Sequence, residues 1–243
     1  VDGASELLLS QRAKDASGSV VFCGMEGTRP VLMDIQALVA QSFYSSPKRT
    51  VNGMDQGRVA LLLAVLEKRA GLRLYNQDVY LNVAGGMSLN EPAADLAVCL
   101  AVASSLWDSA LPMDLAAMGE VGLAGEVRSI PQLERRMAEC KRLGFTKIMC
   151  PADRKLKGGQ VEGVQIIYVS SVAQAIGLLK PKYLMMAVRW INKEIDAYNS
   201  NIKLFTSTGK WWFLLSVALA AIHLIVYMSI MPCLIVAAGF TVN

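Results

Sequence analysis

The stretch Leu81–Ser105, LNVAGGMSLNEPAADLAVCLAVASS, decides the fold of this chain. It begins as an apolar run typical of a strand and breaks at Gly85 and Gly86. It then restarts as a helix with Pro92 in the first turn, where the missing N–H of proline costs nothing. Beyond Pro92 almost every side chain is small or apolar, and Asp95 carries the only charge. Because a helix that is apolar on all sides is normally buried, we expect this helix to form the core of a packed domain.

Strand and helix patterns alternate along residues 19–179, which predicts one α/β domain of ordinary size. We expect strands over residues 19–25, 30–39, 78–83, 147–150 and 164–169, and a hairpin over residues 117–130. We expect helices over residues 55–70, 93–105, 132–143 and 171–179. Residues 1–18 are polar and are interpreted as a linker or an edge strand, and residues 45–49 as a basic loop.

The chain changes character after residue 179. Residues 180–210 form a basic linker, and a hydrophobic helical tail without a charged residue follows from Trp211 onward. About 20 apolar residues suffice to cross a bilayer, and Trp211, Trp212 and Phe213 lie where an interfacial aromatic belt would be. We therefore predict a transmembrane helix over residues 211–235, with a buried helical hairpin as the alternative.

Charge is distributed unevenly along the 243 residues, whose formal net charge is +4. Residues 1–179 carry 18 Lys and Arg against 18 Asp and Glu, so the whole excess lies in residues 180–243. The five cysteines are scattered and form no C-x-x-C motif, which argues against a disulfide framework and a zinc knuckle. We expect buried, reduced thiols in an intracellular reducing compartment, either the cytoplasm or a DNA-containing organelle such as a plastid or mitochondrion.

Two basic clusters interrupt the otherwise neutral domain. The candidate DNA-binding residues are Lys48, Arg49 and Arg58 in the first cluster and Arg135, Arg136 and Arg142 in the second. Clustered cations suit contact with a phosphate backbone and also the packing of subunits in a ring, whereas a solvated face is the simplest alternative. The clusters contain no interleaved aromatic residues, so we expect backbone contacts that are independent of sequence, with little base stacking.

Several motifs follow one another in the order and with the spacing of a known family. They are MEGTRP at residues 25–30, RVALLLAVLEKR at 58–69, GEVGLAGEVR at 119–128 and LERR at 133–136. From about Ser5 to Leu179 the chain resembles the C-terminal Lon-protease-like domain of the RadA/Sms DNA-repair ATPases. The resemblance implies the α/β fold of the Lon proteolytic domain, which is ribosomal protein S5 domain 2-like and packs into homo-hexameric rings. The hydrophobic tail has no counterpart in that family.

Lon-type peptidases use a Ser–Lys dyad in which a deprotonated lysine activates a serine at a helix N-terminus. When the proline of the family's Asp-Gly-Pro-Ser-Ala-Gly motif is matched to Pro92, Ala93 takes the serine position. The family's lysine follows Ile-Gly-Gly-Leu, which reads IPQL at residues 130–133 here, so Glu134 takes the lysine position. Alanine has no nucleophile and glutamate has the wrong charge, so this degenerate dyad implies no proteolysis. Ser88 is expected to lie in the preceding loop.

The resemblance also implies partners and cofactors. No Gly-x-x-x-x-Gly-Lys-Ser/Thr motif occurs, so ATP and zinc would belong to domains upstream of Val1, in a longer protein, and we expect no cofactor or metal site in this segment. We expect a non-proteolytic module of an ATP-dependent DNA repair protein that supports ring assembly and binds the backbone of single-stranded or branched DNA during branch migration. The alternatives are a divergent Lon-like serine peptidase and a membrane-tethered interaction scaffold.

Overall fold

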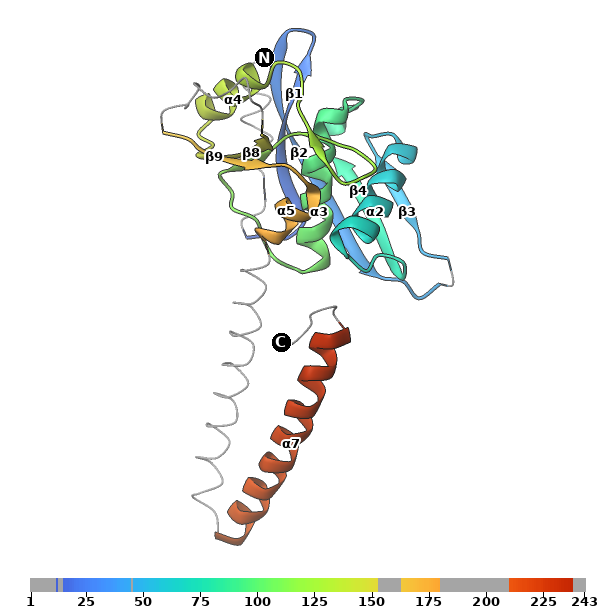
Figure 1. Cartoon of the computed structure of the whole chain (residues 1–243), viewed down its shortest axis with the longest axis vertical. Helices are drawn as coiled ribbons and strands as arrows, with labels where there is room; N and C mark the ends of the chain where they lie inside the picture. The colour runs from blue at the N-terminus through green and yellow to red at the C-terminus, as the bar shows by residue number, and fades with distance from the viewer. Residues whose placement is uncertain (1–11, 13–14, 45, 153–162, 180–209, 238–243) are drawn as a thin grey trace. The chain divides into compact units, whose positions relative to one another are not determined.

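The structure of the chain is a computed structural model that describes residues 12, 15–44, 46–152, 163–179 and 210–237 (Figure 1). The chain divides into two compact units, Val1–Leu184 and Met185–Asn243. Each unit is described by itself below.

The first unit is built on a seven-stranded mixed sheet with the strand order β3-β4-β2-β1-β5-β8-β9. Its strands are β1 (Ser19–Glu26), β2 (Arg29–Gln41), β3 (Arg49–Asn52), β4 (Gln77–Val83), β5 (Leu115–Ala117), β8 (Lys147–Pro151) and β9 (Gln165–Val169). Strands β1, β2 and β4 pair antiparallel, whereas the β3–β4, β1–β5, β5–β8 and β8–β9 pairs are parallel. A separate hairpin is formed by β6 (Glu120–Val121) and β7 (Val127–Arg128). The predicted α/β fold is confirmed.

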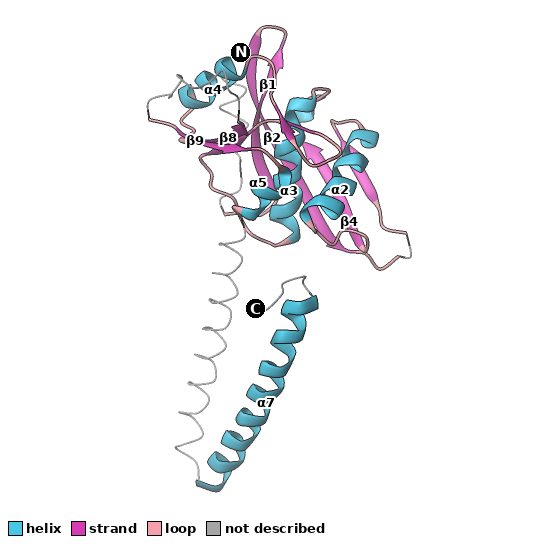
Figure 2. Cartoon of the chain, viewed as in Figure 1, coloured by secondary structure: helices cyan, strands magenta, loops and turns pink. Residues whose placement is uncertain are grey.

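The apolar stretch in the centre of the sequence forms the central helix. A short 3₁₀ turn, η2 (Pro92–Ala94), leads into α3 (Asp95–Leu106), which is buried at every residue from Asp95 to Ser104. Helix α3 packs against β1 and β2 on one side and contacts α2 and α5 on the other. Figure 2 shows these helices as a layer over the strands. The prediction of a core helix is therefore confirmed.

The remaining helices begin and end where local signals in the sequence predict. Helix α2 (Gln56–Ala70) begins after Asp55, whose side chain accepts a hydrogen bond from the backbone N–H of Arg58, and ends at Gly71 with φ of 69°. Helices α4 (Leu133–Arg142) and α5 (Val172–Gly177) lie within the expected ranges.

Strand β3 differs from the sequence-based expectation, which placed a basic loop over residues 45–49. Arg49 already belongs to this strand, which pairs with β4 through Arg49–Val79 to Asn52–Asn82. The strand is short, lies at the edge of the sheet and has only half-buried or exposed side chains, so it has no strong apolar pattern. Pairing with β4 therefore holds residues 49–52 in an extended conformation that their own sequence does not predict.

The second unit contains helix α7 (Lys210–Ala237), so a helix is present where the hydrophobic tail was expected. Across the described residues, no helix combines the length and the apolar character that a membrane crossing requires. The prediction of a transmembrane helix over residues 211–235 is corrected accordingly. The expected linkers, residues 1–18 and 180–210, lie largely outside the described residues.

Candidate functional site

The N-terminal end of α3 is the place where the resemblance locates a catalytic serine. Ala93 holds that position in η2, is 4% exposed and carries only a methyl group. Gly119 N–H donates to the Ala93 carbonyl at 2.7 Å, and Leu96 N–H donates to the Gly119 carbonyl at 3.0 Å. Gly119 has no room for a side chain, because a Cβ there would lie 2.7 Å from Cγ1 of Val127. The start of α3 is therefore packed tightly against Gly119, and backbone hydrogen bonds hold the two segments together.

An ion pair lies beside this helix end. Glu91 directly precedes η2, and its Oε2 lies 2.7 Å from Nη2 of Arg136 in α4. The Arg136 guanidinium also donates to the carbonyls of Cys23 at 2.6 Å and Pro131 at 3.1 Å, while Met25 N–H donates to Oε1 of Glu91 at 2.9 Å. Arg136 is only 2% exposed, which argues against the predicted contact with DNA. Its guanidinium is committed to partners inside the domain.

The burial of Arg136 has a signal in the sequence. Leu133, Arg136, Met137 and Cys140 recur at helical spacing and are the buried residues of α4. Arginine on an otherwise apolar stripe indicates a buried partner, which here is the carboxylate before Pro92. Glu134, at the position of the family's lysine, is exposed on another side of the same helix. Ala93 and Glu134 thus lie in different environments, one buried and one in solvent.

A second ion pair holds the first turn of α3 to α2. Asp95 is fully buried, accepts from Nε of Arg58 at 3.0 Å and makes a further ion pair with Nη2 of Arg58. The backbone N–H of Val121 donates to Oδ2 of Asp95 at 2.9 Å. Burial raises the pKa of Asp95 even though Arg58 and Val121 act to lower it. The hydrogen bond to Asp95 raises the pKa of the more exposed Arg58, so burial dominates for one partner and pairing for the other.

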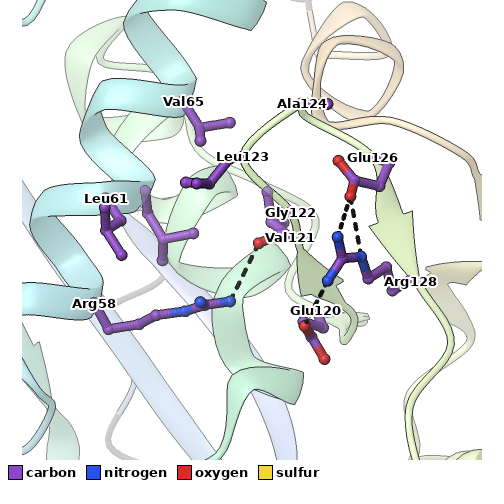
Figure 3. A pocket seen from close by; sticks show the side chains of 11 residues that line it. Arg58, Leu61, Val65, Glu120, Val121, Gly122, Leu123, Ala124, Glu126 and Arg128 are labelled. Atoms are coloured by element: carbon purple, nitrogen blue, oxygen red, sulfur yellow. Dashed lines mark hydrogen bonds and ion pairs between the residues drawn. The ribbon is translucent and has the colours of Figure 1, made fainter.

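A cavity of about 440 Å³ lies next to this ion pair, between α2 and the β6–β7 hairpin (Figure 3). Figure 3 shows the Arg58 guanidinium donating to the Val121 carbonyl, and Arg128 paired with Glu120 and Glu126 on the opposite wall. Its lining residues include no serine, cysteine, lysine or histidine, and neither Ala93 nor Glu134 lines it. The cavity therefore offers charged and apolar walls without a nucleophile.

The other DNA-binding candidates differ in how their cations are held. Arg49 donates to the carbonyls of Lys48 at 3.2 Å, Leu74 at 2.8 Å and Gln77, so its guanidinium supports the loop before β4. Arg142 pairs with Glu139 at 2.7 Å on the surface of α4. Lys48 lies just before β3, Arg49 on β3 and Arg58 on α2, whereas the other three candidates lie on α4. The structure therefore does not bring all of them together.

Three of the candidates, Lys48, Arg135 and Arg142, are exposed, and Arg142 is paired with Glu139, which leaves Lys48 and Arg135. Lys48 Nζ lies 4.7 Å from the centroid of the Tyr44 ring, and the Lys48 backbone N–H donates to Asp78 at 2.7 Å. These two cations are the best placed of the six to meet a ligand in solvent.

The described cysteines are Cys23, Cys99, Cys140 and Cys150, and all four are buried and free, as the sequence predicts. Burial raises the pKa of the Cys150 thiol to about 12. A hydrogen bond with Cys23, together with burial, raises the pKa of Cys140. Such thiols are not thiolate nucleophiles at neutral pH. Within the described ranges, no group of three or more His, Cys, Asp or Glu side chains is arranged to hold a metal ion.

Comparison with known proteins shows which family this domain resembles. Residues 67–177 match the model of the Lon protease (S16) C-terminal proteolytic domain. The chain is 45% identical over 172 residues to the DNA repair protein RadA of Bacillus subtilis (strain 168), an alignment that covers 71% of this chain and 38% of that protein. It is 46% identical over 175 residues to the DNA repair protein RadA of Aquifex aeolicus (strain VF5), covering 72% and 38%. The chain contains a RadA-like Lon C-terminal domain.

The RadA-like Lon domain spans about two fifths of the length of the curated relatives that it matches, since the alignments cover 38% of each. The match to the Lon model begins within α2 and ends with α5, so it includes α3, the β6–β7 hairpin and α4. Within the same range, Ala93 lies in η2, Asp95 in α3 and Arg136 in α4. The family predicted from the sequence motifs is confirmed.

Proposed function

We propose that this RadA-like Lon domain is a non-proteolytic module of an ATP-dependent DNA repair protein. The absence of proteolysis is inferred from the tightly packed N-terminal end of α3. Ala93 is buried there, and the adjacent Glu91–Arg136 pair is locked by additional hydrogen bonds. Acyl transfer requires a nucleophile and a base in contact at an accessible point. Neither Ala93 nor Glu134 supplies one.

The DNA-repair part of the proposal rests on the similarity to proteins called DNA repair protein RadA. The domain would help subunits to assemble into a homo-hexameric ring and would bind the backbone of single-stranded or branched DNA during branch migration. ATP and zinc would be bound by other domains of the same protein. Free, buried thiols suit a reducing compartment inside a cell.

The first prediction concerns proteolysis. The chain, alone or fused to an active ATPase, should leave fluorescently labelled casein intact, because the dyad positions hold Ala93 and Glu134. The measurement is the release of labelled peptides over time, with an active Lon-type peptidase as the positive control. Ser88 is exposed in the loop before η2 and is the nearest hydroxyl upstream. Cleavage that persists through purification and disappears in Ser88→Ala would refute the proposal.

The second prediction concerns the salt dependence of DNA binding. Lys48→Ala and Arg135→Ala should each weaken binding to all single-stranded sequences alike, because a cation that contacts phosphate reads no base. Each variant should also flatten the slope of log affinity against log salt by roughly 0.7 for each lost contact. Fluorescence anisotropy titrations at several salt concentrations measure both effects.

The matched control for these variants is Arg142→Ala, whose guanidinium pairs with Glu139. It should change the slope less than Lys48→Ala or Arg135→Ala does. If the affinity of the unmodified chain does not respond to salt, or if all variants have equal slopes, these cations do not contact DNA and are only part of a solvated surface.

A further inference from the structure

Three aromatic rings lie in solvent at one end of the sheet. Phe43 is 93% exposed, Tyr75 is 70% exposed and Tyr44 is 64% exposed. Phe43 and Tyr44 belong to the loop that joins β2 to β3, whereas Tyr75 belongs to the loop that joins α2 to β4. Figure 1 shows the β2–β3 loop at the end of the sheet far from α4. Large apolar surface kept in solvent at one place indicates a contact site.

The backbone holds these two loops together. Ser42 N–H donates to the Asn76 carbonyl at 2.9 Å, which joins the residue next to Phe43 to the residue next to Tyr75. The Ser42 hydroxyl accepts from Tyr44 N–H at 3.3 Å and so shapes the turn that carries both rings of the first loop. The rings therefore project from a fixed base, although they are about 30 residues apart in the sequence.

Positive charge lies next to the rings. Lys48 Nζ is 4.7 Å from the centroid of the Tyr44 ring, a cation–π distance, and the Lys48 side chain remains exposed. The main-chain N–H of Lys48 is held by Asp78, and backbone hydrogen bonding to Lys48 lowers the pKa of that carboxyl. Arg49 binds the Leu74 carbonyl at 2.8 Å, which fixes the loop leading to Tyr75.

The adjacent face of the sheet extends this surface. Leu38 of β2 is exposed and lies opposite Tyr80 of β4, which in turn lies opposite Thr50 of β3. Asn82, farther along the same face of β4, accepts from Nδ2 of Asn52 at 2.8 Å. Apolar groups and amides on an open sheet face can meet the flat surface and the polar edge of a base.

We propose that Phe43, Tyr44, Tyr75 and Lys48 form a base-stacking site for single-stranded nucleic acid. The rings offer flat faces to unstacked bases, and Lys48 neutralises the phosphate beside them. This combination accepts any base, because every base has a π-face. The proposal rests on DNA binding by the domain and adds to it a place and a mode of contact beyond the phosphate backbone. It also replaces the expectation of little base stacking, since folding brings together rings that the sequence separates.

The test compares two oligonucleotides that differ only in their bases. One is an oligomer of about 16 thymidines, the upper end of a single module's site size, and the other has the same length with abasic sites throughout. Fluorescence anisotropy of the full chain gives both affinities. Phe43→Ala, Tyr44→Ala and Tyr75→Ala should each weaken thymidine binding by about fivefold or more and leave binding of the abasic strand unchanged. Lys48→Ala should weaken both.

Two further variants serve as controls. Tyr44→Phe keeps the ring and should bind like the unmodified chain. Tyr168→Ala removes another exposed tyrosine, on β9 at the opposite edge of the sheet, and should also bind like it. Thermal melting and sedimentation velocity of every variant report folding and oligomeric state.

The possible outcomes separate the stacking site from DNA binding itself. Retained affinity in all three ring variants, or equal losses on both oligonucleotides, would overturn the stacking site while DNA binding stands. A change in oligomeric state with unchanged affinity would assign the rings to a contact between subunits and would also overturn it. Failure of the unmodified chain to bind either oligonucleotide or a duplex would overturn the proposed DNA contact and the stacking site together.

Discussion

Replacing Arg136 by alanine is expected to lower the free energy of unfolding of the domain by about 3–5 kcal/mol. The guanidinium is 2% exposed, and its loss would leave the Glu91 carboxylate without its charged partner. It would also remove the donors to the carbonyls of Cys23 and Pro131, which lie on different elements. Breaking one side of this pair costs more than the pair itself contributes, because the Glu91 charge that remains is only 26% exposed and stays partly desolvated. Urea unfolding followed by circular dichroism measures the difference.

The neighbouring arginine on the same helix provides the control. Arg135 is exposed, so Arg135→Ala should change the unfolding free energy by less than about 0.5 kcal/mol. A double-mutant cycle with Arg136→Ala and Glu91→Ala should give a coupling energy of about 1–3 kcal/mol. Equal stabilities of Arg135→Ala and Arg136→Ala would contradict the structural role assigned to Arg136.

Replacing Arg58 by alanine is expected to destabilise the domain by about 3 kcal/mol at neutral pH, with a deficit that shrinks in acid. The pKa of Asp95 is already raised above its ordinary value of 3.8 by burial, and removing Arg58 removes a group that lowers it. A carboxyl whose pKa is higher in the folded than in the unfolded protein favours folding when protonated. That contribution is lost as pH rises through the folded-state pKa. The deficit should therefore diminish as pH falls through that raised pKa toward 3.8.

Two variants test this assignment. Arg142→Ala removes the exposed partner of Glu139 and should cost less than about 1 kcal/mol. The double variant Arg58→Ala/Asp95→Asn should lose the pH dependence, because the carboxyl is gone. A deficit in Arg58→Ala that is constant from neutral to acidic pH would show that Asp95 is not the group responsible. Loss of DNA binding in Arg58→Ala is therefore informative only together with this stability measurement.

The sequence predicts the elements whose signals are local. Helix α3 is recognisable because nearly every residue in it is small or apolar, and α2 because Asp55 and Gly71 mark its ends. Strand β3 escapes prediction because its order comes from pairing with β4, more than 25 residues away in the sequence.

The same physical reason explains what the sequence does not predict in the site. The locked state of Arg136 depends on Glu91, and the grouping of Tyr75 with Phe43 depends on a hydrogen bond between two loops. Both features join residues that are distant along the chain. The clustering of charge in the sequence therefore indicated Arg136 as a DNA contact, although its guanidinium pairs with Glu91 inside the domain.

The order of strands in the sheet has a consequence for the chain as it is synthesised. Strand β1 is complete at Glu26, but its parallel neighbour β5 begins only at Leu115, and β9 is not finished until Val169. During that interval the β1–β2 hairpin can form, while the other edge of β1 stays unpaired beside the emerging apolar helix α3. Unpaired edges and exposed apolar segments promote aggregation of nascent chains. A ribosome that stalls before residue 115 would thus leave an incomplete sheet whose unpaired β1 edge is prone to aggregation. We therefore expect the yield of folded protein to depend on translating this middle region without delay.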